Sequence, residues 1–309
     1  MMAVARSLTP ADALHLAAPH TWIASVYPAL FGELYCLQQG YALPLPTALC
    51  LVTACICMQA SVNTLNDYFD FINGTDTADD FLEKSDAVLV HGSFPVKQAL
   101  YLGIAYLFAA ALIVFPVLIT AGPIPLIIGA TGALAVCTYS GGRLPISYLP
   151  LGELISGLTM GGLIPLGVVA VASQSFHAAV LPAALPLILG IGLIMLTNNT
   201  CDLEKDEQAC RRTLPVLLGR KKALTLYRGC VVLWFSTLCL LPFWYTHAWG
   251  IGSLLLLIVF ARPAFRRLLR FTLTAPQRVA EMKGIVLANL LGNGAYLISF
   301  AAAITGGFS

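Results

Sequence analysis

Residues 46–70 read PTALCLVTACICMQASVNTLNDYFD, and this stretch predicts the fold of the whole chain. Its first part, residues 46–66, is apolar and long enough to cross a bilayer as a helix. Its end is polar, since Asn66 is followed by Asp67 and, four residues after the Asn, by Asp70. Residues four apart lie on one helical face. A carboxylate at the mouth of a membrane helix is costly unless a cationic group holds it, so the stretch predicts a membrane helix that ends in a polar site.

A second stretch later in the chain repeats this pattern. The apolar residues 180–200 contain Asn198 near their end, and Asp202 follows it by four residues. A further Asp comes soon after each copy, Asp76 in the first and Asp206 in the second. An i, i+4, i+8 spacing, which the second copy has, keeps such a series on one helical face. Two matching carboxylate series therefore predict one shared site between two halves of a helical bundle.

The composition indicates the class of protein. Of the 309 residues, 58% are hydrophobic and only 10% are charged, and the mean hydropathy is +0.83. A soluble domain carries about 25% charged residues. The chain is therefore predicted to be an all-α polytopic membrane protein. Its nine cysteines lie mostly in apolar runs, which is typical of small core residues and not of a disulfide framework.

Apolar stretches of about 17–25 residues can each span a bilayer. The sequence contains nine of them, at residues 20–38, 46–66, 97–119, 123–140, 149–173, 180–200, 222–246, 249–265 and 282–304. We expect them to form a single transmembrane domain over residues 1–309. Residues 1–19 form an N-terminal interfacial segment, in which Thr9 caps a short helix with Pro10 in its first turn.

The basic residues predict the orientation in the membrane. All 17 Lys and Arg residues fall before the first predicted span or near the loops that follow spans two, four, six and eight. The opposite loops carry only His177 and His247. By the positive-inside rule the N-terminus is cytoplasmic, and residues 67–96 and 201–221 form cytoplasmic active-site loops. We expect a multi-pass protein of the inner (cytoplasmic) membrane whose active site faces the cytoplasm.

Clustered carboxylates at one membrane face indicate a particular chemistry. Mg²⁺ takes one or two carboxylates and leaves its other positions to water and phosphate oxygens. Two facing clusters can hold two ions across one diphosphate, and Arg143, Arg211 and Arg212 are placed to neutralise the remaining charge. Because a membrane bundle offers an apolar channel, the diphosphate would carry a prenyl chain. Ionisation of a prenyl diphosphate gives an allylic cation, which an electron-rich aromatic acceptor captures.

The two motifs resemble those of the UbiA-type intramembrane prenyltransferases. The first motif of that family, Asn-Asp-x-x-Asp, matches residues 66–70, and the second, Asn-x-x-x-Asp-x-x-x-Asp, matches residues 198–206. The likeness runs from about residue 20 to the end of the chain. Within the family the chain is most similar to the 1,4-dihydroxy-2-naphthoate polyprenyltransferases of menaquinone synthesis, at residues 66–71, 74–76, 139–142, 151–154, 212–214 and 218–219.

This resemblance implies nine helices around a central cavity and an Mg²⁺-dependent transfer of a polyprenyl group to 1,4-dihydroxy-2-naphthoate. The products would be demethylmenaquinol, diphosphate and CO₂. The metal ligands would be Asn66, Asp67, Asp70, Asp76, Asn198, Asp202 and Asp206, and the catalytic residues among them Asp67, Asp70, Asp202 and Asp206. The prenyl diphosphate or the acceptor would be held by Tyr139, Arg143, Lys205, Arg211 and Arg212. The partners would be these two substrates and the lipid bilayer, without nucleic acid or an obligate protein partner.

Some positions depart from the pattern and leave the acceptor open. Gly74 stands where the general family has its third Asp, and Asp76 takes that place as in the naphthoate branch. Cys201 replaces the Arg that is usual in that branch, and residues 210–212 read Cys-Arg-Arg where it usually has Gly-Lys-Arg. The acceptor is therefore 1,4-dihydroxy-2-naphthoate or another aromatic ring such as 4-hydroxybenzoate.

Other interpretations also fit single features. One Asn-Asp-x-x-Asp motif at a helix end is typical of a cap or a turn, and the second copy is what favours a metal site. Intramembrane carboxylates also occur in ion-coupled transporters, but transport sites lie near the bilayer midplane, whereas these residues lie at one face. The roles of Glu33, Glu153 and Cys210, the length of the prenyl chain and the oligomeric state stay open.

Overall fold

The computed structural model describes residues 7–75, 88–92 and 94–306, and in these residues the chain consists of helices and short connections. The first helices are α1 (Pro10–Ala17), η1 (Pro19–Thr21), α2 (Ile23–Gln38), α3 (Leu45–Ile72), α4 (Val88–His91), α5 (Lys97–Ala121) and α6 (Pro123–Ser140). The middle of the chain forms η2 (Ile146–Tyr148), α7 (Gly152–Ser156), η3 (Gly157–Leu163), α8 (Ile164–Ser173), α9 (Val180–Ala183), α10 (Leu185–Cys201), α11 (Leu203–Gln208) and α12 (Leu214–Leu218). The last helices are α13 (Arg220–Thr246), η4 (His247–Trp249), α14 (Gly250–Leu256), η5 (Leu257–Ala261), α15 (Arg262–Leu268), η6 (Ala275–Gln277) and α16 (Arg278–Thr305).

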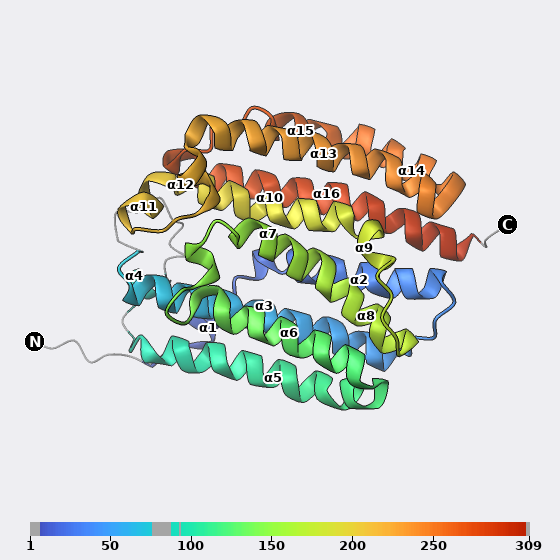
Figure 1. Cartoon of the computed structure of the whole chain (residues 1–309), viewed down its shortest axis with the longest axis horizontal. Coiled ribbons are helices and arrows are strands. Elements are labelled where there is room, and N and C mark those ends of the chain that lie inside the picture. Colours follow the sequence, from blue (N-terminus) through green and yellow to red (C-terminus); the bar gives the residue numbers. More distant parts are fainter. Residues whose placement is uncertain (1–6, 76–87, 93, 307–309) are drawn as a thin grey trace, which may run out of the picture.

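The long helices run side by side along the long axis of the molecule (Figure 1). The short helices α4, α11 and α12 gather at one end of the bundle, and α16 ends at the other (Figure 1). The helix α10 packs against η3, α13 and α16, while α3 packs against α5, α6 and α2. The two helices that end in the Asp motifs therefore belong to different parts of one bundle.

The predicted polytopic membrane class is confirmed. Each of the nine stretches predicted to span the membrane overlaps a helix of the described residues. Six helical stretches there are long and apolar enough to cross a membrane, at residues 45–72, 97–121, 123–140, 152–173, 220–268 and 275–305. The helix α10 is shorter than these, and α13 and α14 fall within one of the six although the chain turns at His247, where φ is 50°. The count of nine crossings and the side of the N-terminus stay predictions.

The outer surface of α5 shows why the chain needs a lipid environment. Large apolar side chains at Ile104, Phe108, Leu112 and Phe115 are each more than half exposed. They recur every three or four residues, so they form one continuous face of the helix. A contiguous apolar face of this kind is rare on a soluble monomer and is ordinary where a helix contacts lipid tails.

The N-terminal segment is fixed to α3 at the end that carries the first motif. The predicted cap of α1 is confirmed, because Thr9 Oγ1 accepts from the Asp12 backbone N–H at 3.3 Å and Pro10 lies in the first turn. At the other end of α1, the carbonyl of Ala17 accepts hydrogen bonds from Asn63 Nδ2 at 3.0 Å and from Trp22 Nε1 at 2.8 Å. These bonds satisfy a carbonyl that the helix end would otherwise leave without a partner.

Glycine allows α10 to approach its neighbour closely. The segment η3 is a π-helix, and a Cβ at Gly161 would lie only 2.5 Å from the backbone N and Cα of Ile188 in α10. On the opposite side of α10, Asn289 of α16 donates a hydrogen bond to the carbonyl of Gly190 at 3.0 Å. The helix is thus held from two sides, and this packing fixes the position of the second Asp motif.

Candidate functional site

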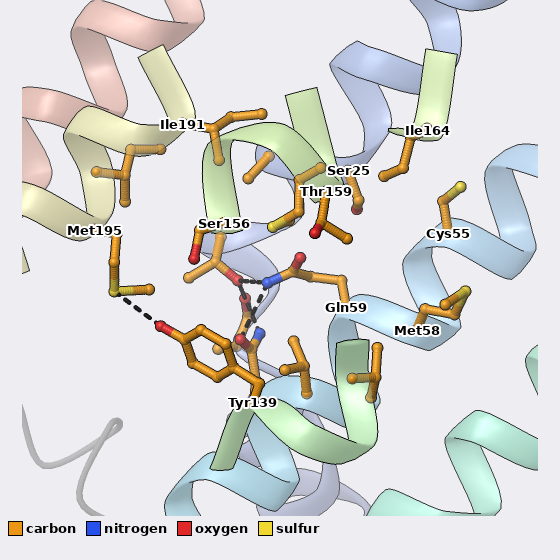
Figure 2. Close-up of a pocket in the computed structure, with 18 of the residues that line it drawn as sticks. Ser25, Cys55, Met58, Gln59, Tyr139, Ser156, Thr159, Ile164, Ile191 and Met195 are labelled. Carbon is orange, nitrogen blue, oxygen red and sulfur yellow. Dashed lines mark hydrogen bonds between the residues drawn. The ribbon is translucent and has the colours of Figure 1, made fainter. Parts of the chain in front are cut away.

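A cavity of about 750 Å³ lies inside the bundle, and both Asp motifs reach it. Asn66, Asp67 and Asp70 of α3 line it, together with Asn198 and Asn199 of α10. Away from these residues the wall is mostly apolar. Figure 2 shows side chains that point into this space, among them Met58, Gln59, Tyr139, Thr159 and Met195.

The first motif lies on one face of α3, as the spacing predicts. The helix continues to Ile72, so Asn66 and Asp70 are one turn apart, and Asn66 Nδ2 donates to Asp70 Oδ2 at 3.0 Å. Ser140, at the end of α6, donates through Oγ to Asn66 Oδ1 at 2.7 Å. This chain of bonds sets the orientation of the amide and leaves the other oxygen of Asp70 for a cation.

The second motif crosses a break in the helix. The helix α10 ends at Cys201, and α11 begins at Leu203, but the backbone bonds continue from Asp202 N to Asn198 O at 3.0 Å and from Asp206 N to Asp202 O at 2.8 Å. Arg278 of α16 donates from Nε to Asp202 Oδ2 at 3.0 Å and from Nη2 to Asn198 Oδ1 at 2.6 Å. One guanidinium therefore holds two members of the motif.

A second arginine connects the two motifs. Arg211 pairs through Nη2 with Asp70 Oδ1, and its Nη1 lies 3.6 Å from Asp206 Oδ1. Its Cζ also lies 4.6 Å from the centre of the Tyr148 ring, within the range of a cation–π contact. Thr213 donates to the other oxygen of Asp206 at 3.2 Å. Arg211 therefore contacts one carboxylate from each of the two motifs.

Burial and neighbouring charges change the ionisation of this cluster. Burial raises the pKa of Asp206 to about 7, Arg211 acts against this rise, and Asp202 adds to it. Burial by itself lowers the pKa of Arg211, but the carboxylates of Asp70 and Asp206 outweigh that effect and raise it. Arg211 is thus a permanent cation, whereas Asp206 changes charge near neutral pH.

The other predicted site residues are not all at the cavity. Tyr139 lines it, and its hydroxyl lies 3.2 Å from Met195 Sδ (Figure 2). Lys205 is half-buried on α11 and does not line the cavity, while Arg143 and Arg212 are exposed and also lie outside its wall. Asp202 and Asp206 do not line it either, but each is paired with an arginine that does. Asp76 lies outside the described residues.

Two cationic residues at the cavity have no role in the sequence-based site. Arg278 and Lys283 line the cavity from the first turns of α16. In the sequence they belong to the basic loops that predict membrane orientation, and their only further signal is that they lie on the same membrane side as the motifs. The helix packing that brings α16 beside α10 could not be read from their spacing.

The structure also places Glu153, whose role the sequence leaves open, and Cys201, which departs from the pattern of the naphthoate branch. Glu153, at the start of α7, is buried and accepts a hydrogen bond from Asn199 Nδ2 at 2.9 Å, so it orients a side chain of the cavity wall. Cys201 is buried away from the cavity, and its Sγ lies 3.7 Å from Glu281 Oε2. The side chain at the position where that branch usually has Arg therefore does not line the cavity.

The oxygen donors fit a hard cation that is shared with a phosphate group. Among the described residues, no three His, Cys, Asp or Glu side chains come close enough to hold a metal ion by themselves. Mg²⁺ does not need such a cage, because it binds one or two carboxylates and takes its other ligands from water and substrate phosphate. Carboxylate and amide oxygens from both motifs gather around Arg211 and Arg278. These oxygens are ligands of the type that Mg²⁺ binds together with water and phosphate.

The far part of the cavity is apolar. It extends between α3, α5, α6 and α8, where Leu51, Val114, Leu118 and Ile128 line it. Gly132 of α6 keeps this part open, because a Cβ there would lie 3.3 Å from Met58 Cε and would point toward no other heavy atom within 4 Å. The cavity thus combines a charged mouth with a long apolar arm.

Comparisons with known proteins agree with this arrangement. The sequence model of the UbiA prenyltransferase family matches residues 25–291. The 1,4-dihydroxy-2-naphthoate octaprenyltransferase of Bacillus subtilis (strain 168) is 30% identical over 88% of this chain and 81% of its own length. The human UbiA prenyltransferase domain-containing protein 1 is 25% identical over 87% of this chain and 82% of its own. A solved UbiA homologue from Archaeoglobus fulgidus, bound to GPP and Mg²⁺, superposes with a TM-score of 0.62 over 95% of this chain and 99% of the other, at 15% identity.

Proposed function

Because the chain belongs to the UbiA prenyltransferase family, we propose that it transfers a polyprenyl group from an isoprenyl diphosphate to 1,4-dihydroxy-2-naphthoate. The reaction would release diphosphate and CO₂ and give demethylmenaquinol. One observation carries the proposal: Asp70 and Asp206, from motifs far apart in the chain, meet at one cation beside an apolar cavity. A charged mouth on an apolar arm suits a substrate with a diphosphate head and a prenyl tail.

The metal would be Mg²⁺, which supplies positive charge that stabilises the leaving diphosphate. The residues that would hold it are Asn66, Asp67, Asp70, Asn198, Asp202 and Asp206, together with Asp76. The chain's own cations would share this task, because Arg211, Arg278 and Lys283 all line the cavity at its polar end. A solved family member carries GPP and Mg²⁺, which supports this choice of metal.

The prenyl chain would lie in the apolar arm, where water is excluded from the allylic cation. The acceptor ring would enter at the junction of the arm and the polar end, beside Tyr139 and the Asn199–Glu153 pair. Its identity is proposed from the likeness to the Bacillus subtilis enzyme. Cys201 would not contact the acceptor, because its side chain is packed against Glu281 and does not line the cavity.

The protein is a multi-pass membrane enzyme, and we propose the inner membrane as its site, with the polar end of the cavity toward the cytoplasm. The basic loops support this orientation through the positive-inside rule. The ion-coupled transporter considered from the sequence is set aside, because the family is one of enzymes.

The test is prenyl transfer by the purified full chain in lipid nanodiscs. A labelled polyprenyl diphosphate is offered with 1,4-dihydroxy-2-naphthoate or with 4-hydroxybenzoate, and with Mg²⁺ or EDTA. We expect a prenylated naphthoquinol and an equal amount of CO₂ with the first acceptor and Mg²⁺ only. Transfer to 4-hydroxybenzoate alone would contradict 1,4-dihydroxy-2-naphthoate as the acceptor. Transfer to neither acceptor by a folded protein would contradict the proposed reaction.

A further inference from the structure

A second hollow lies on the outer surface of the bundle, away from the cavity of the Asp motifs. Its volume is about 430 Å³, and its lining consists of Ile258, Pro263 and the exposed arginines Arg262, Arg266, Arg267 and Arg270. These residues belong to η5, α15 and the turn that follows α15. In Figure 1, α15 runs in the outer layer of the bundle beside α13, between α14 and the end marked by α11 and α12.

The four arginines of this hollow differ from those that support the fold and the cavity. Arg211, Arg220 and Arg278 each form an ion pair with a carboxylate. Within the described residues, none of the four arginines on the hollow has a carboxylate partner. The sequence explains part of this difference, because no Asp or Glu occurs between residues 250 and 280.

The spacing of these arginines brings like charges close together. Arg262 and Arg266 are four residues apart, so they lie on one face of α15, and Arg270 follows in the turn after the helix. Like charges at i and i+4 repel each other and destabilise a helix. An anion bound from outside would relieve this repulsion, and the planar guanidinium group binds phosphate oxygens in pairs.

The surface beside the arginines indicates what kind of anion fits. Leu255, Ile258 and Val259 precede Arg262 on the same helical stretch and are exposed by 58%, 45% and 61% of their surface. Ile258 lines the hollow itself. A continuous path thus leads from an apolar, lipid-facing surface to a cluster of phosphate-binding groups. A free phosphate ion would contact only the arginines. A phospholipid would contact the arginines with its headgroup and the apolar side chains with its acyl chain.

We propose that this hollow binds the headgroup phosphate of an anionic phospholipid whose acyl chain lies along the exposed apolar surface of α14 and η5. Basic residues near the membrane surface attract anionic lipids, and a cluster does so more strongly than a single charge. The bound lipid would neutralise α15, which packs against α13 and α16. It would thereby stabilise the end of the bundle on which α16 presents Arg278 and Lys283 to the cavity.

The test is lipid binding by the full chain, purified in detergent and followed by native mass spectrometry. Phosphatidylglycerol and phosphatidylcholine with identical acyl chains are titrated onto the wild type and onto Arg266→Gln/Arg270→Gln. We expect the wild type to prefer phosphatidylglycerol, and the double variant to bind it about tenfold more weakly. The matched control is Lys221→Gln/Lys222→Gln, which removes the same charge from exposed positions on α13 outside the hollow and should bind like the wild type.

Three results would overturn the proposal. Equal losses of phosphatidylglycerol binding in the two double variants would show that the lipid is attracted to the basic surface in general. Unchanged phosphatidylglycerol binding in Arg266→Gln/Arg270→Gln would show that the hollow is not the site. Displacement of the lipid by soluble glycerol 1-phosphate at comparable concentration would show a site for free phosphate esters. Because the substituted arginines are exposed and repel one another, both variants should elute as folded protein in size-exclusion chromatography, which is checked first.

Discussion

Among single residues, Arg211 is the one at which the two Asp motifs meet. Its guanidinium pairs with Asp70 of α3 and lies near Asp206 of α11 while it stacks on Tyr148. A buried cation that loses one of two carboxylates is left partly uncompensated, and this is strongly unfavourable. Charge at Asp70 is therefore needed both for the arrangement of the site and for any cation that the substrate brings.

The first prediction follows from this pairing. We expect Asp70→Asn to lower prenyl transfer by about 100-fold or more, because it removes one negative charge from the polar end of the cavity. The control is Glu204→Gln, which removes a carboxylate that is 58% exposed and pairs with Arg220 away from the cavity. Initial rates with labelled 1,4-dihydroxy-2-naphthoate check the prediction. Full activity in a correctly inserted Asp70→Asn protein would contradict the proposed metal site.

A second prediction concerns pH and Asp206. The pKa of this carboxyl is raised by burial to about 7 in the folded protein, whereas an unfolded Asp has a pKa of about 3.9. Between these values the folded state keeps a proton that the unfolded chain has released, so the free energy of unfolding falls as the pH rises. In EDTA, we expect the midpoint of thermal unfolding to decrease from about pH 5 to about pH 8.

The variant Asp206→Asn isolates this effect, because the amide stays neutral at every pH of the experiment. Its unfolding midpoint should depend less on pH than that of the wild type. Glu204→Gln is again the control, since the pKa of Glu204 is lowered by its bonds to Arg220 in spite of partial burial. Identical pH profiles of the wild type and Asp206→Asn would show that the Asp206 carboxyl does not carry the proton.

The members of the polar site could be predicted from sequence only where a helix repeats them at fixed spacing. Asn66 and Asp70 are one turn apart, and the structure brings them to the cavity as expected. Arg278 could not be found in this way, because it reaches Asp202 only when α16 packs beside α10. Arg143 is the reverse case. Its position after an apolar run predicted a place in the polar site, but its side chain is exposed.

At the scale of helices, the apolar runs predict where elements lie but not how they end or bend. The apolar run predicted over residues 46–66 ends where charged residues begin. The helix α3 nevertheless continues to Ile72, and Asp70 within it pairs with Arg211. The π-helical turn of η3 has no signal in hydropathy. It lies where the chain packs closely on α10, an approach that Gly157 and Gly161 allow.

The third prediction tests that contact. We expect Gly161→Ala to destabilise the protein by about 1–3 kcal/mol, because its Cβ would meet the Ile188 backbone at 2.5 Å and backbone cannot move aside cheaply. The matched control is Gly229→Ala on α13, where a Cβ meets nothing within 4 Å and alanine favours the helix. The apparent midpoint of thermal unfolding in detergent checks both variants. Equal stability of the two would contradict the close packing of η3 on α10.

The fourth prediction concerns the apolar arm and rests on the proposed function. A leucine at Gly132 would fill space opposite Met58, so we expect Gly132→Leu to accept short prenyl diphosphates and to lose transfer of long ones. Gly252→Leu is the control, because Gly252 is exposed on α14 and has no neighbour within 4 Å. Rates are compared across a series of prenyl diphosphates of increasing length. A uniform loss at every length would place the prenyl chain elsewhere.

At the scale of the whole molecule, charge is distributed unevenly along the bundle. The polar end of the cavity holds Arg211 and Arg278, and α11 and α12 mark the same end in Figure 1. All 17 Lys and Arg residues of the sequence belong to the segments predicted for one side of the membrane. The helix bundle itself carries no information about which side that is, so the orientation is argued from charge alone.

The fifth prediction tests this orientation with single-cysteine proteins. Cys210 is an exposed free cysteine between α11 and α12, and Ala178 is an exposed residue between α8 and α9, on the predicted opposite side. In a chain whose other cysteines are replaced by alanine, we expect Cys210 to resist a membrane-impermeant maleimide in intact cells and to react in inverted vesicles. A cysteine at position 178 should behave in the reverse way. If Cys210 reacts in intact cells instead, the polar end of the cavity faces outward, where a diphosphate made in the cytoplasm could not reach it without first crossing the membrane.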